Sequence, residues 1–161
     1  MYIKSVGNGQ DFQTELLLGI DKIEEQVSSE KSGKNDYKKV HRPEYLPFSK
    51  SVLLVKRNQE RGHKSRCPRT PFLKAMYNCI APMLRKGRSK LRVFVALGSS
   101  LDIFHGVDCF FDYEGKIVTV DVTISSWKER YKADVLITLE DIQRNEHYRK
   151  ARFIAQLLQT R

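Results

Sequence analysis

The sequence predicts an α/β fold in which a central mixed β-sheet is flanked by helices and preceded by an N-terminal helical extension. Segments with helical and strand-like hydrophobic periodicity alternate along the 161 residues, a length suited to one ordinary domain. Two β-rich runs meet at Glu114-Gly115, a dipeptide typical of a tight hairpin turn. A further β-rich run and a helical segment follow the hairpin, and this order favours a mixed sheet.

The N-terminal extension is predicted from a helical pattern over residues 11–27. Its apolar positions recur at spacings of three and four, at Phe12, Leu16, Ile20, Ile23 and Val27. The stretch 28–50 is rich in Ser, Lys and Pro, which is typical of a linker. We therefore expect an N-terminal helix and linker over residues 1–50 and an α/β core over residues 51–161.

The core is predicted to contain five strands and two helices. In chain order, the expected elements are a strand over 51–55, a basic loop over 56–69, a helix from residue 71, strands over 91–97, 107–113, 116–125 and 135–138, and a helix over about 140–159. Thr70 followed by Pro71 predicts a capped helix start, and Pro82 should kink or end that helix. Thr138 with Asp141 predicts a capping box for the final helix.

Several protein classes are disfavoured by composition. The longest apolar run has about five residues, whereas a membrane-spanning helix needs about 20, so we expect no membrane partner. The first residues lack the apolar core of a signal peptide, and three cysteines at wide spacings do not suggest a disulfide framework. Both features favour a cytoplasmic location. Zinc-binding spacings and a phosphate-binding loop motif are also missing from the sequence.

Positive charge is concentrated in one block of the chain. The formal net charge is +10, and residues 56–92 hold twelve bases and one acid, whereas residues 93–125 hold five acids and one base. Bases that hold a phosphate backbone beside acids that hold a divalent cation would suit phosphodiester cleavage. The alternative is a solvated surface without a partner. The candidates for nucleic-acid binding in this block are Lys56, Arg57, Arg61, Lys64, Arg66, Arg69, Arg85, Lys86, Arg88 and Lys90.

The hairpin turn sets a register that brings two carboxylates together. A two-residue loop pairs Tyr113 with Lys116 and gives one apolar face, made of the pairs Phe111–Val118, Cys109–Val120 and Val107–Val122. On the other face Asp108 lies opposite Asp121, with their Cβ atoms about 4.5–5.5 Å apart. Such a pair repels unless a cation bridges it or one acid is protonated, so we expect Mg²⁺ or Mn²⁺. Alternatively, both aspartates are exposed to solvent, as we expect for Asp112.

The segment His105-Gly106-Val107-Asp108 and the segment Val120-Asp121-Val122-Thr123 carry a family resemblance. Together they resemble the PD-(D/E)XK nuclease superfamily, which has a restriction-endonuclease-like fold, over about residues 70–159. The resemblance implies a metal-dependent nuclease acting on nucleic acid, with DNA expected over RNA. It also implies that Asp108 and Asp121 are the metal ligands, joined by the carbonyl of Val122, and it allows a homodimer.

Two features depart from the family pattern. Only about nine residues separate Ser125 from Val135, although a parallel crossover usually needs a dozen or more, and Thr123 stands where the family has Lys. The resemblance then implies that Lys116 or Lys128 supplies the cation, and the catalytic candidates are Asp108, Asp121, Thr123 and Lys128. Asp102 is the candidate third metal ligand, in place of a helix Glu in the family, and a loop-capping role is its alternative.

Three functional hypotheses follow. The first is a Mg²⁺- or Mn²⁺-dependent endonuclease that hydrolyses phosphodiester bonds. The second is a non-catalytic nucleic-acid-binding protein on a nuclease-like fold, for which Thr123 would mark the loss of activity. The third is an RNA-binding or assembly protein in which the hairpin has no catalytic role.

Overall fold

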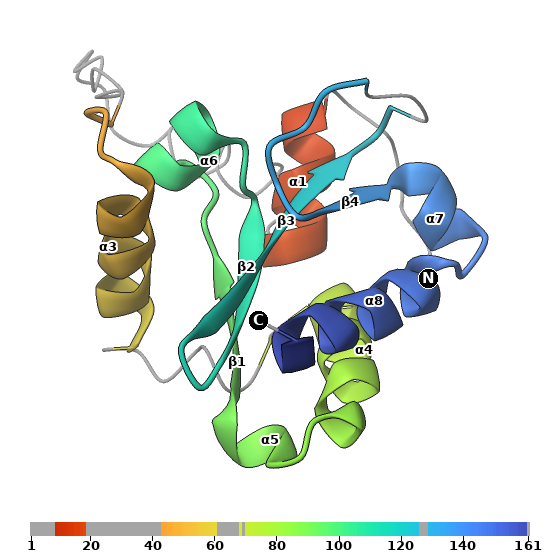
Figure 1. The fold of residues 1–161 in the computed structure, drawn as a ribbon. Helices are drawn as coiled ribbons and strands as arrows, with labels where there is room; N and C mark the ends of the chain where they lie inside the picture. The colour runs from red at the N-terminus through yellow and green to blue at the C-terminus, as the bar shows by residue number, and fades with distance from the viewer. Residues whose placement is uncertain (1–8, 19–42, 61–67, 69, 126–128, 161) are drawn as a thin grey trace, which may run out of the picture.

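The computed structural model describes residues 9–18, 43–60, 68, 70–125 and 129–160. Its elements in chain order are α1 (Gly9–Leu18), α3 (Phe48–Glu60), α4 (Pro71–Ile80), the 3-10 helix η1 (Ala81–Met83), α5 (Gly87–Lys90), β1 (Leu91–Val95), α6 (Ser100–His105), β2 (Cys109–Tyr113), β3 (Lys116–Thr123), β4 (Val135–Thr138), α7 (Leu139–Gln143) and α8 (His147–Thr160) (Figure 1). The strands form one sheet in the order β1-β2-β3-β4, antiparallel except for the parallel pair β3–β4. The predicted α/β class with a mixed sheet is confirmed.

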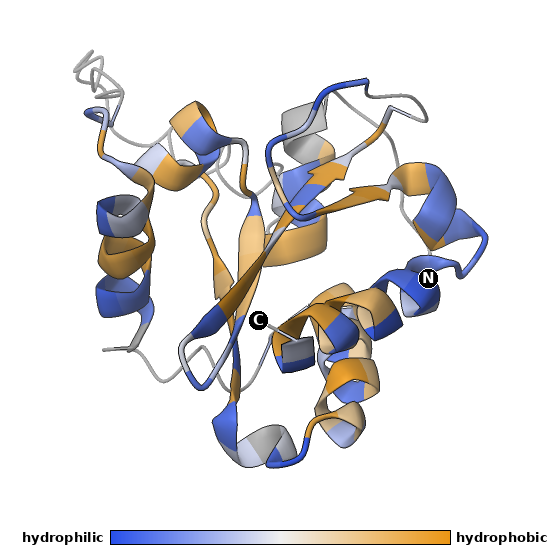
Figure 2. Ribbon diagram, in the orientation of Figure 1, coloured by the Kyte–Doolittle hydropathy of each residue, from blue (hydrophilic) through white to orange (hydrophobic). Residues whose placement is uncertain are grey.

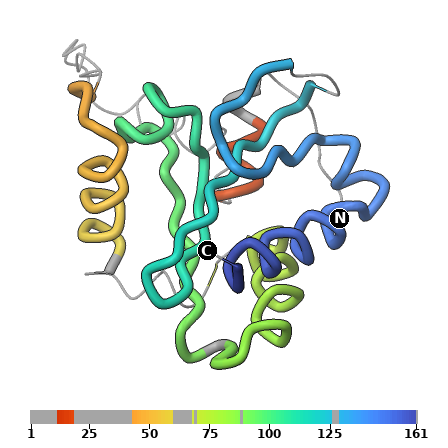
Figure 3. The backbone as a smooth tube through the Cα atoms, in the orientation of Figure 1, coloured from red at the N-terminus to blue at the C-terminus, as the bar shows by residue number. Residues whose placement is uncertain are grey.

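Helices cover both faces of this sheet (Figure 1). Helices α1, α4 and α8 pack on one face, and α3 and α6 pack on the other. Figure 2 shows mainly apolar strands between helices that carry both apolar and polar residues, as expected for helices with one buried side. The chain path in Figure 3 places α5 and the β2–β3 turn at one end of the sheet and α6 at the other.

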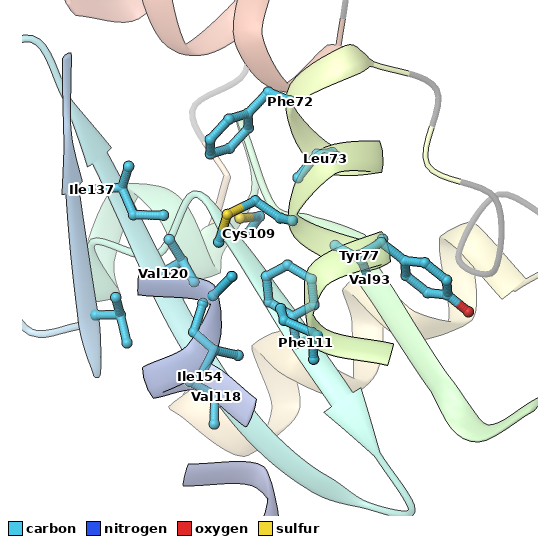
Figure 4. Close-up of a cluster of buried hydrophobic side chains, with 14 of the residues drawn as sticks. Phe72, Leu73, Tyr77, Val93, Cys109, Phe111, Val118, Val120, Ile137 and Ile154 are labelled. Carbon is cyan, nitrogen blue, oxygen red and sulfur yellow. The ribbon is translucent and has the colours of Figure 1, made fainter. Parts of the chain in front are cut away.

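The larger hydrophobic cluster lies between the sheet and α1, α4 and α8. Side chains from α4, β2, β3, β4 and α8 meet there (Figure 4), among them Phe72, Phe111, Val118, Val120, Ile137 and Ile154. Helix α1 contributes Phe12, Leu16 and Leu17 to the same cluster. The helix expected as an N-terminal extension is therefore packed into this cluster, and residues 19–27 of the predicted pattern lie outside the described part.

The other face of the sheet carries a smaller cluster beneath α3. Val52 and Val55 of α3 pack with buried residues of β1 and β2, where the rings of Phe94 and Phe110 stack with their centroids 5.0 Å apart. The side-chain amide of Gln59 bonds both the N–H and the carbonyl of Val95 on the outer edge of β1. Helix α3 thus covers one face of the sheet and also caps part of its free edge.

The predicted strand over 51–55 is wrong, because these residues belong to α3. Val52 and Val55 are buried while Leu53 and Leu54 are 46% and 44% exposed, which is a helical pattern. A five-residue apolar run does not distinguish a strand from one side of a helix. The expected boundary at residue 50 also lies inside this helix, and residues 56–60 extend it into the predicted loop.

Short sequence motifs predicted the positions of most other elements correctly. The Thr70 hydroxyl accepts a hydrogen bond from the Leu73 N–H at 3.2 Å, and α4 ends at Ile80, two residues before Pro82. The capping box of Thr138 and Asp141 is present. The helix predicted over about 140–159 is instead divided into α7 and α8 by a turn over residues 144–146.

A pH-dependent stability is expected from His147, which is 6% exposed at the start of α8. Within the described part of the chain, its Nδ1 atom has no hydrogen-bond partner. Burial lowers the pKa of His147 from the ordinary value of 6.5, and hydrogen bonding and charge at Asp141 partly oppose this. The unfolded chain therefore binds more protons, so stability should fall as the pH drops below 6.5. Urea midpoints at pH 7.5 and 5.5 should differ in wild type and differ less in His147→Gln. An unchanged difference in the variant would assign the effect to other groups.

Candidate carboxylate site

Asp108 and Asp121 lie at the end of the sheet near α6, away from the hairpin turn. Asp108 immediately precedes β2, Asp121 lies in β3, and their exposed fractions are 2% and 3%. Burial of both excludes the alternative of two solvent-exposed aspartates. Buried carboxylates are costly unless hydrogen bonds or a cation compensate their charge.

The hairpin register is confirmed over most of its length and changes at Asp108. Tyr113 pairs with Lys116 and Cys109 pairs with Val120, as predicted. Beyond this point the Asp108 N–H donates to the Val120 carbonyl at 2.9 Å, and the Asp108 carboxylate accepts from the Val122 N–H at 2.7 Å. In a continued ladder, that Val122 N–H would donate to the carbonyl of residue 107.

The predicted pairing of Val107 with Val122 is therefore wrong. Val107 packs in the smaller cluster on the α3 side, whereas Val122 packs in the larger cluster on the opposite face. The Asp108 side chain replaces a ladder acceptor, and it lies against the β3 backbone instead of standing directly opposite Asp121.

Gln13 of α1 also belongs to the site, although nothing in the sequence indicated it. The Nε2 atom of Gln13 donates to Asp108 Oδ2 at 3.1 Å and to the Val122 carbonyl at 2.7 Å. Gln13 is separated from Asp108 by 95 residues, and a polar residue beside an apolar helix face is ordinary in sequence. The Gln13 amide reaches the Asp108 and Val122 oxygen atoms because α1 packs against β3, and the local sequence does not specify this packing.

Asp102 lies beside the two aspartates and also makes the loop contact that was its alternative role. Its Oδ2 atom accepts from the Gly98 N–H at 2.8 Å. Burial raises the pKa of Asp102, opposed by hydrogen bonds with Gly98 and Asp108 and increased further by the charge of Asp121. Burial also raises the pKa of the Cys109 thiol, with further contributions from the charges of Asp108 and Asp121. The three carboxylates thus interact electrostatically.

The donor set of the site consists of oxygen atoms, which suits Mg²⁺ or Mn²⁺. In the described ranges, no three His, Cys, Asp or Glu side chains are grouped closely enough to hold a metal ion together. Asp102, Asp108 and Asp121 are therefore not placed as a three-carboxylate metal site. The predicted ligands Asp108, Asp121 and the Val122 carbonyl all lie at this end of the sheet.

Lys116 does not supply the positive charge that the Lys of the family motif would bring to the carboxylate site. Its Nζ atom donates to the Gln159 carbonyl at 3.2 Å, beside the hairpin turn at the opposite end of β3. Lys128 lies outside the described residues. Thr123 ends β3, half-buried, and its hydroxyl accepts from the Ser125 N–H at 3.2 Å. Thr123 can hydrogen-bond a water molecule but carries no positive charge.

His105 of the family-like segment has a structural contact. Its Nε2 atom is 2.8 Å from the Leu46 carbonyl, and its ring packs against Tyr45 and Phe48. A groove of about 530 Å³ lies between α3 and the loop before α6, with Gly98 on its lining. Since Gly98 also binds Asp102, this groove borders the carboxylate site.

Several of the described bases of the basic block lie at the other end of the sheet from Asp108 and Asp121. Lys86 and Lys90 lie at α5, where Lys86 pairs with Glu114 of the hairpin turn at 2.9 Å. Strand β1 then leads from this end to the carboxylate end, so neighbours in sequence are separated in space. Lys56 and Arg57 belong to the second half of α3, and Arg85 precedes α5. The remaining candidates fall outside the described side chains: Arg61, Lys64, Arg66, Arg69 and Arg88.

Comparison of the chain with protein-family models, curated proteins and solved structures found no match. None of the helices in the described part combines the length and apolar composition that a membrane crossing requires.

Proposed function

We propose that this protein is a metal-dependent nuclease that hydrolyses phosphodiester bonds of nucleic acid, with DNA as the expected substrate. The observation that carries the proposal is the burial of Asp108, just before β2, and of Asp121, in the neighbouring strand β3, at 2% and 3% exposure beside the Val122 carbonyl. The mixed sheet of three antiparallel strands and a parallel fourth strand, packed between helices, supports the proposal at the level of the α/β class.

Each residue of the site has a defined task in this proposal. A bound Mg²⁺ or Mn²⁺ would polarise the scissile phosphate and lower the pKa of an attacking water. Asp108 and Asp121 would bind the ion, and the Val122 N–H holds the Asp108 carboxylate in place. Thr123 would orient water by a hydrogen bond, without the charge that a Lys would add.

The test is cleavage of supercoiled plasmid and of single-stranded DNA with Mg²⁺, Mn²⁺ or EDTA. Wild type should cut only with the metal ion, and Asp108→Asn and Asp121→Asn should each lose at least about 100-fold, or about 2.7 kcal/mol of transition-state stabilisation. Glu146→Gln, which changes a carboxylate in the turn before α8, should cut like wild type. Equal cutting by all four proteins would assign the activity to another site or to a contaminant.

A non-catalytic nucleic-acid-binding protein is the second candidate, and Thr123 at the motif Lys position favours it. Under this alternative, the protein would bind DNA in the same assays but would cut neither substrate with either metal ion.

A further inference from the structure

A cluster of aromatic rings lies where the segment before α3 and the start of α3 meet α6. It consists of Tyr45, Phe48, Phe104 and His105, called the aromatic cluster below. The Tyr45 ring lies 5.5 Å from the Phe104 ring, at 84°, and 5.8 Å from the His105 ring. The Phe48 ring lies 5.6 Å from the His105 ring, at 83°. Figure 1 shows the start of α3 beside α6, and the two helices are in contact.

The two outer rings of the aromatic cluster are open to solvent. Tyr45 is 60% exposed and Phe48 is 45% exposed, whereas Phe104 and His105 are half-buried. Nearly perpendicular rings overlap little, so much of the flat surface of Tyr45 and Phe48 stays open to a further ring. Exposed aromatic side chains that gather in one place are typical of a binding surface.

Hydrogen bonds position the backbone of the aromatic cluster. The Leu46 N–H donates to Ser100 Oγ at 3.0 Å. The Leu46 carbonyl accepts from Ser51 Oγ at 3.1 Å and lies 2.8 Å from His105 Nε2. Ser51 and Ser100 are buried and bond each other at 3.3 Å. Because these bonds join residues 45–48 to α6, the rings are placed before a partner binds, which lowers the ordering cost of binding.

The charges near the aromatic cluster favour an anionic partner. The Lys132 Nζ atom donates to the Phe104 carbonyl at 3.1 Å, and this side chain is exposed. Lys50, in the first turn of α3, is also exposed. Glu44 is an exposed acid on the segment before α3, and the two lysines outweigh its charge. The formal net charge of the whole chain, +10, also favours a polyanion.

Single-stranded nucleic acid combines the two properties that this surface requires. Its phosphates suit lysine side chains, and its unpaired bases have flat faces that stack on aromatic rings whatever the sequence. In a duplex the base faces are already stacked on one another, so they are not available to Tyr45 or Phe48.

The aromatic cluster is close to the carboxylate site because α6 takes part in both. His105 is three residues before Asp108, so their Cα atoms are at most about 11 Å apart. Asp102 of α6 lies one helical turn before His105 and binds the Gly98 N–H beside the carboxylates. A strand stacked on the aromatic cluster would therefore pass near the carboxylate site.

We propose that the aromatic cluster stacks unpaired bases of a single-stranded nucleic acid, with Tyr45 and Phe48 as the stacking rings and Lys132 as a phosphate contact. Stacking does not depend on catalysis. The role of the cluster in presenting a single strand for cleavage rests on the proposed nuclease function.

The first experiment measures binding of a labelled 20-nucleotide oligo(dT) by fluorescence anisotropy in EDTA. Tyr45→Leu keeps an apolar side chain but removes the ring, so it should weaken binding about tenfold, whereas Tyr45→Trp should bind at least as tightly as wild type. Phe48→Leu should show a loss in the same direction. The matched control is Tyr148→Leu, at a 46% exposed position on α8, which covers the opposite face of the sheet, and it should bind like wild type.

A second probe separates stacking from charge. A strand of the same length built from abasic nucleotides keeps the phosphates and has no base to stack. Wild type should bind it about tenfold more weakly than oligo(dT), and Tyr45→Leu should bind it like wild type. Lys132→Ala should weaken binding of both strands alike, because it removes a phosphate contact. Oligo(U) in the same assay distinguishes RNA from DNA as the source of the bases.

Several results would overturn the proposal. These are equal binding of oligo(dT) and the abasic strand by wild type, equal losses for Tyr45→Leu and Tyr148→Leu, or no binding of either strand. Losses as large for Tyr45→Trp as for Tyr45→Leu would also contradict stacking. Self-association of wild type that Tyr45→Leu abolishes, measured by sedimentation, would instead assign the cluster to an interface between copies of the chain.

The stacking site and the nuclease can fail separately. Asp108→Asn should bind oligo(dT) at least as tightly as wild type, because it keeps every ring of the aromatic cluster and removes a negative charge. Ring-dependent binding without any cutting by wild type would reject the nuclease and keep the stacking site. Cutting of oligo(dT) at equal rates by wild type and Tyr45→Leu at low substrate concentration would keep the nuclease and reject the stacking site.

Discussion

Magnesium or manganese should stabilise wild type against unfolding and should leave Asp108→Asn and Asp121→Asn unchanged. A ligand that binds only the folded state at 100 times its Kd stabilises a protein by about 2.7 kcal/mol. In a chain of this size that corresponds to a rise in Tm of about 5–10 °C. The measurement is thermal unfolding by circular dichroism with the metal ion or with EDTA, and it needs no substrate and no catalytic activity.

The Asn variants are suitable because Asn has nearly the shape of Asp and keeps one oxygen that can accept a hydrogen bond, while the second oxygen becomes an NH2 donor and the negative charge is removed. At Asp108 this oxygen can still accept from the Val122 N–H, so the local backbone is maintained. Glu146→Gln is the control for the loss of one negative charge elsewhere and should respond to Mg²⁺ like wild type. An equal rise in Tm for Asp108→Asn and wild type would remove this aspartate from the metal site.

Gln13 adds a second comparison to this experiment. Its amide nitrogen bonds Asp108 and the Val122 carbonyl, two of the oxygen atoms that would bind the ion. Gln13→Leu removes this donor and should lower stability in EDTA by about 1–3 kcal/mol, because buried acceptors lose a partner. The variant keeps both carboxylates and should still be stabilised by Mg²⁺, unlike the two Asn variants.

The hairpin shows how far local sequence signals extend. Glu114 and Gly115 both have positive φ, at 54° and 87°, which a type I′ turn requires. The turn sets the register, and the register sets which side chains share a face as far as Cys109 and Val120. The turn does not predict that the regular strand pairing ends at Asp108, because there the Asp108 side chain bonds to the backbone of β3.

Contacts between distant segments explain the remaining differences. Val52 and Val55 form a helix side because Phe94 and Phe110 offer an apolar surface beneath them. The connection of Gln13 to the carboxylates depends on where α1 packs, which no local pattern specifies. The basic and acidic blocks are adjacent in sequence, yet β1 separates part of them by the length of a strand. Counting charges along the sequence therefore predicts which charged residues a surface contains better than it predicts where that surface lies on the fold.

Lys56→Met should lower the free energy of unfolding by about 3 kcal/mol, since it leaves the buried Asp112 carboxylate without its cation. The side chains of Lys56 and Asp112 are 23% and 7% exposed, so water replaces the lost partner poorly. The Lys56 ammonium also lies 5.9 Å from the centre of the Phe94 ring, a further contact that the variant loses. Urea denaturation at pH 7 measures the effect, and Lys86→Met in the exposed pair with Glu114 should cost no more than about 1 kcal/mol.

The double variant Lys56→Met/Asp112→Asn separates the cost of an unpaired charge from a general loss of packing. Asn at position 112 can still accept from the Gly115 N–H and maintain the turn, but it carries no charge that needs Lys56. The double variant should therefore recover most of the stability that Lys56→Met loses and unfold within about 1 kcal/mol of wild type. Additive losses from the two substitutions would mean that the Lys56 side chain acts by packing on the Phe94 ring. In that case the ion pair would not be what stabilises the Asp112 carboxylate, which is buried although the sequence predicted it to be exposed.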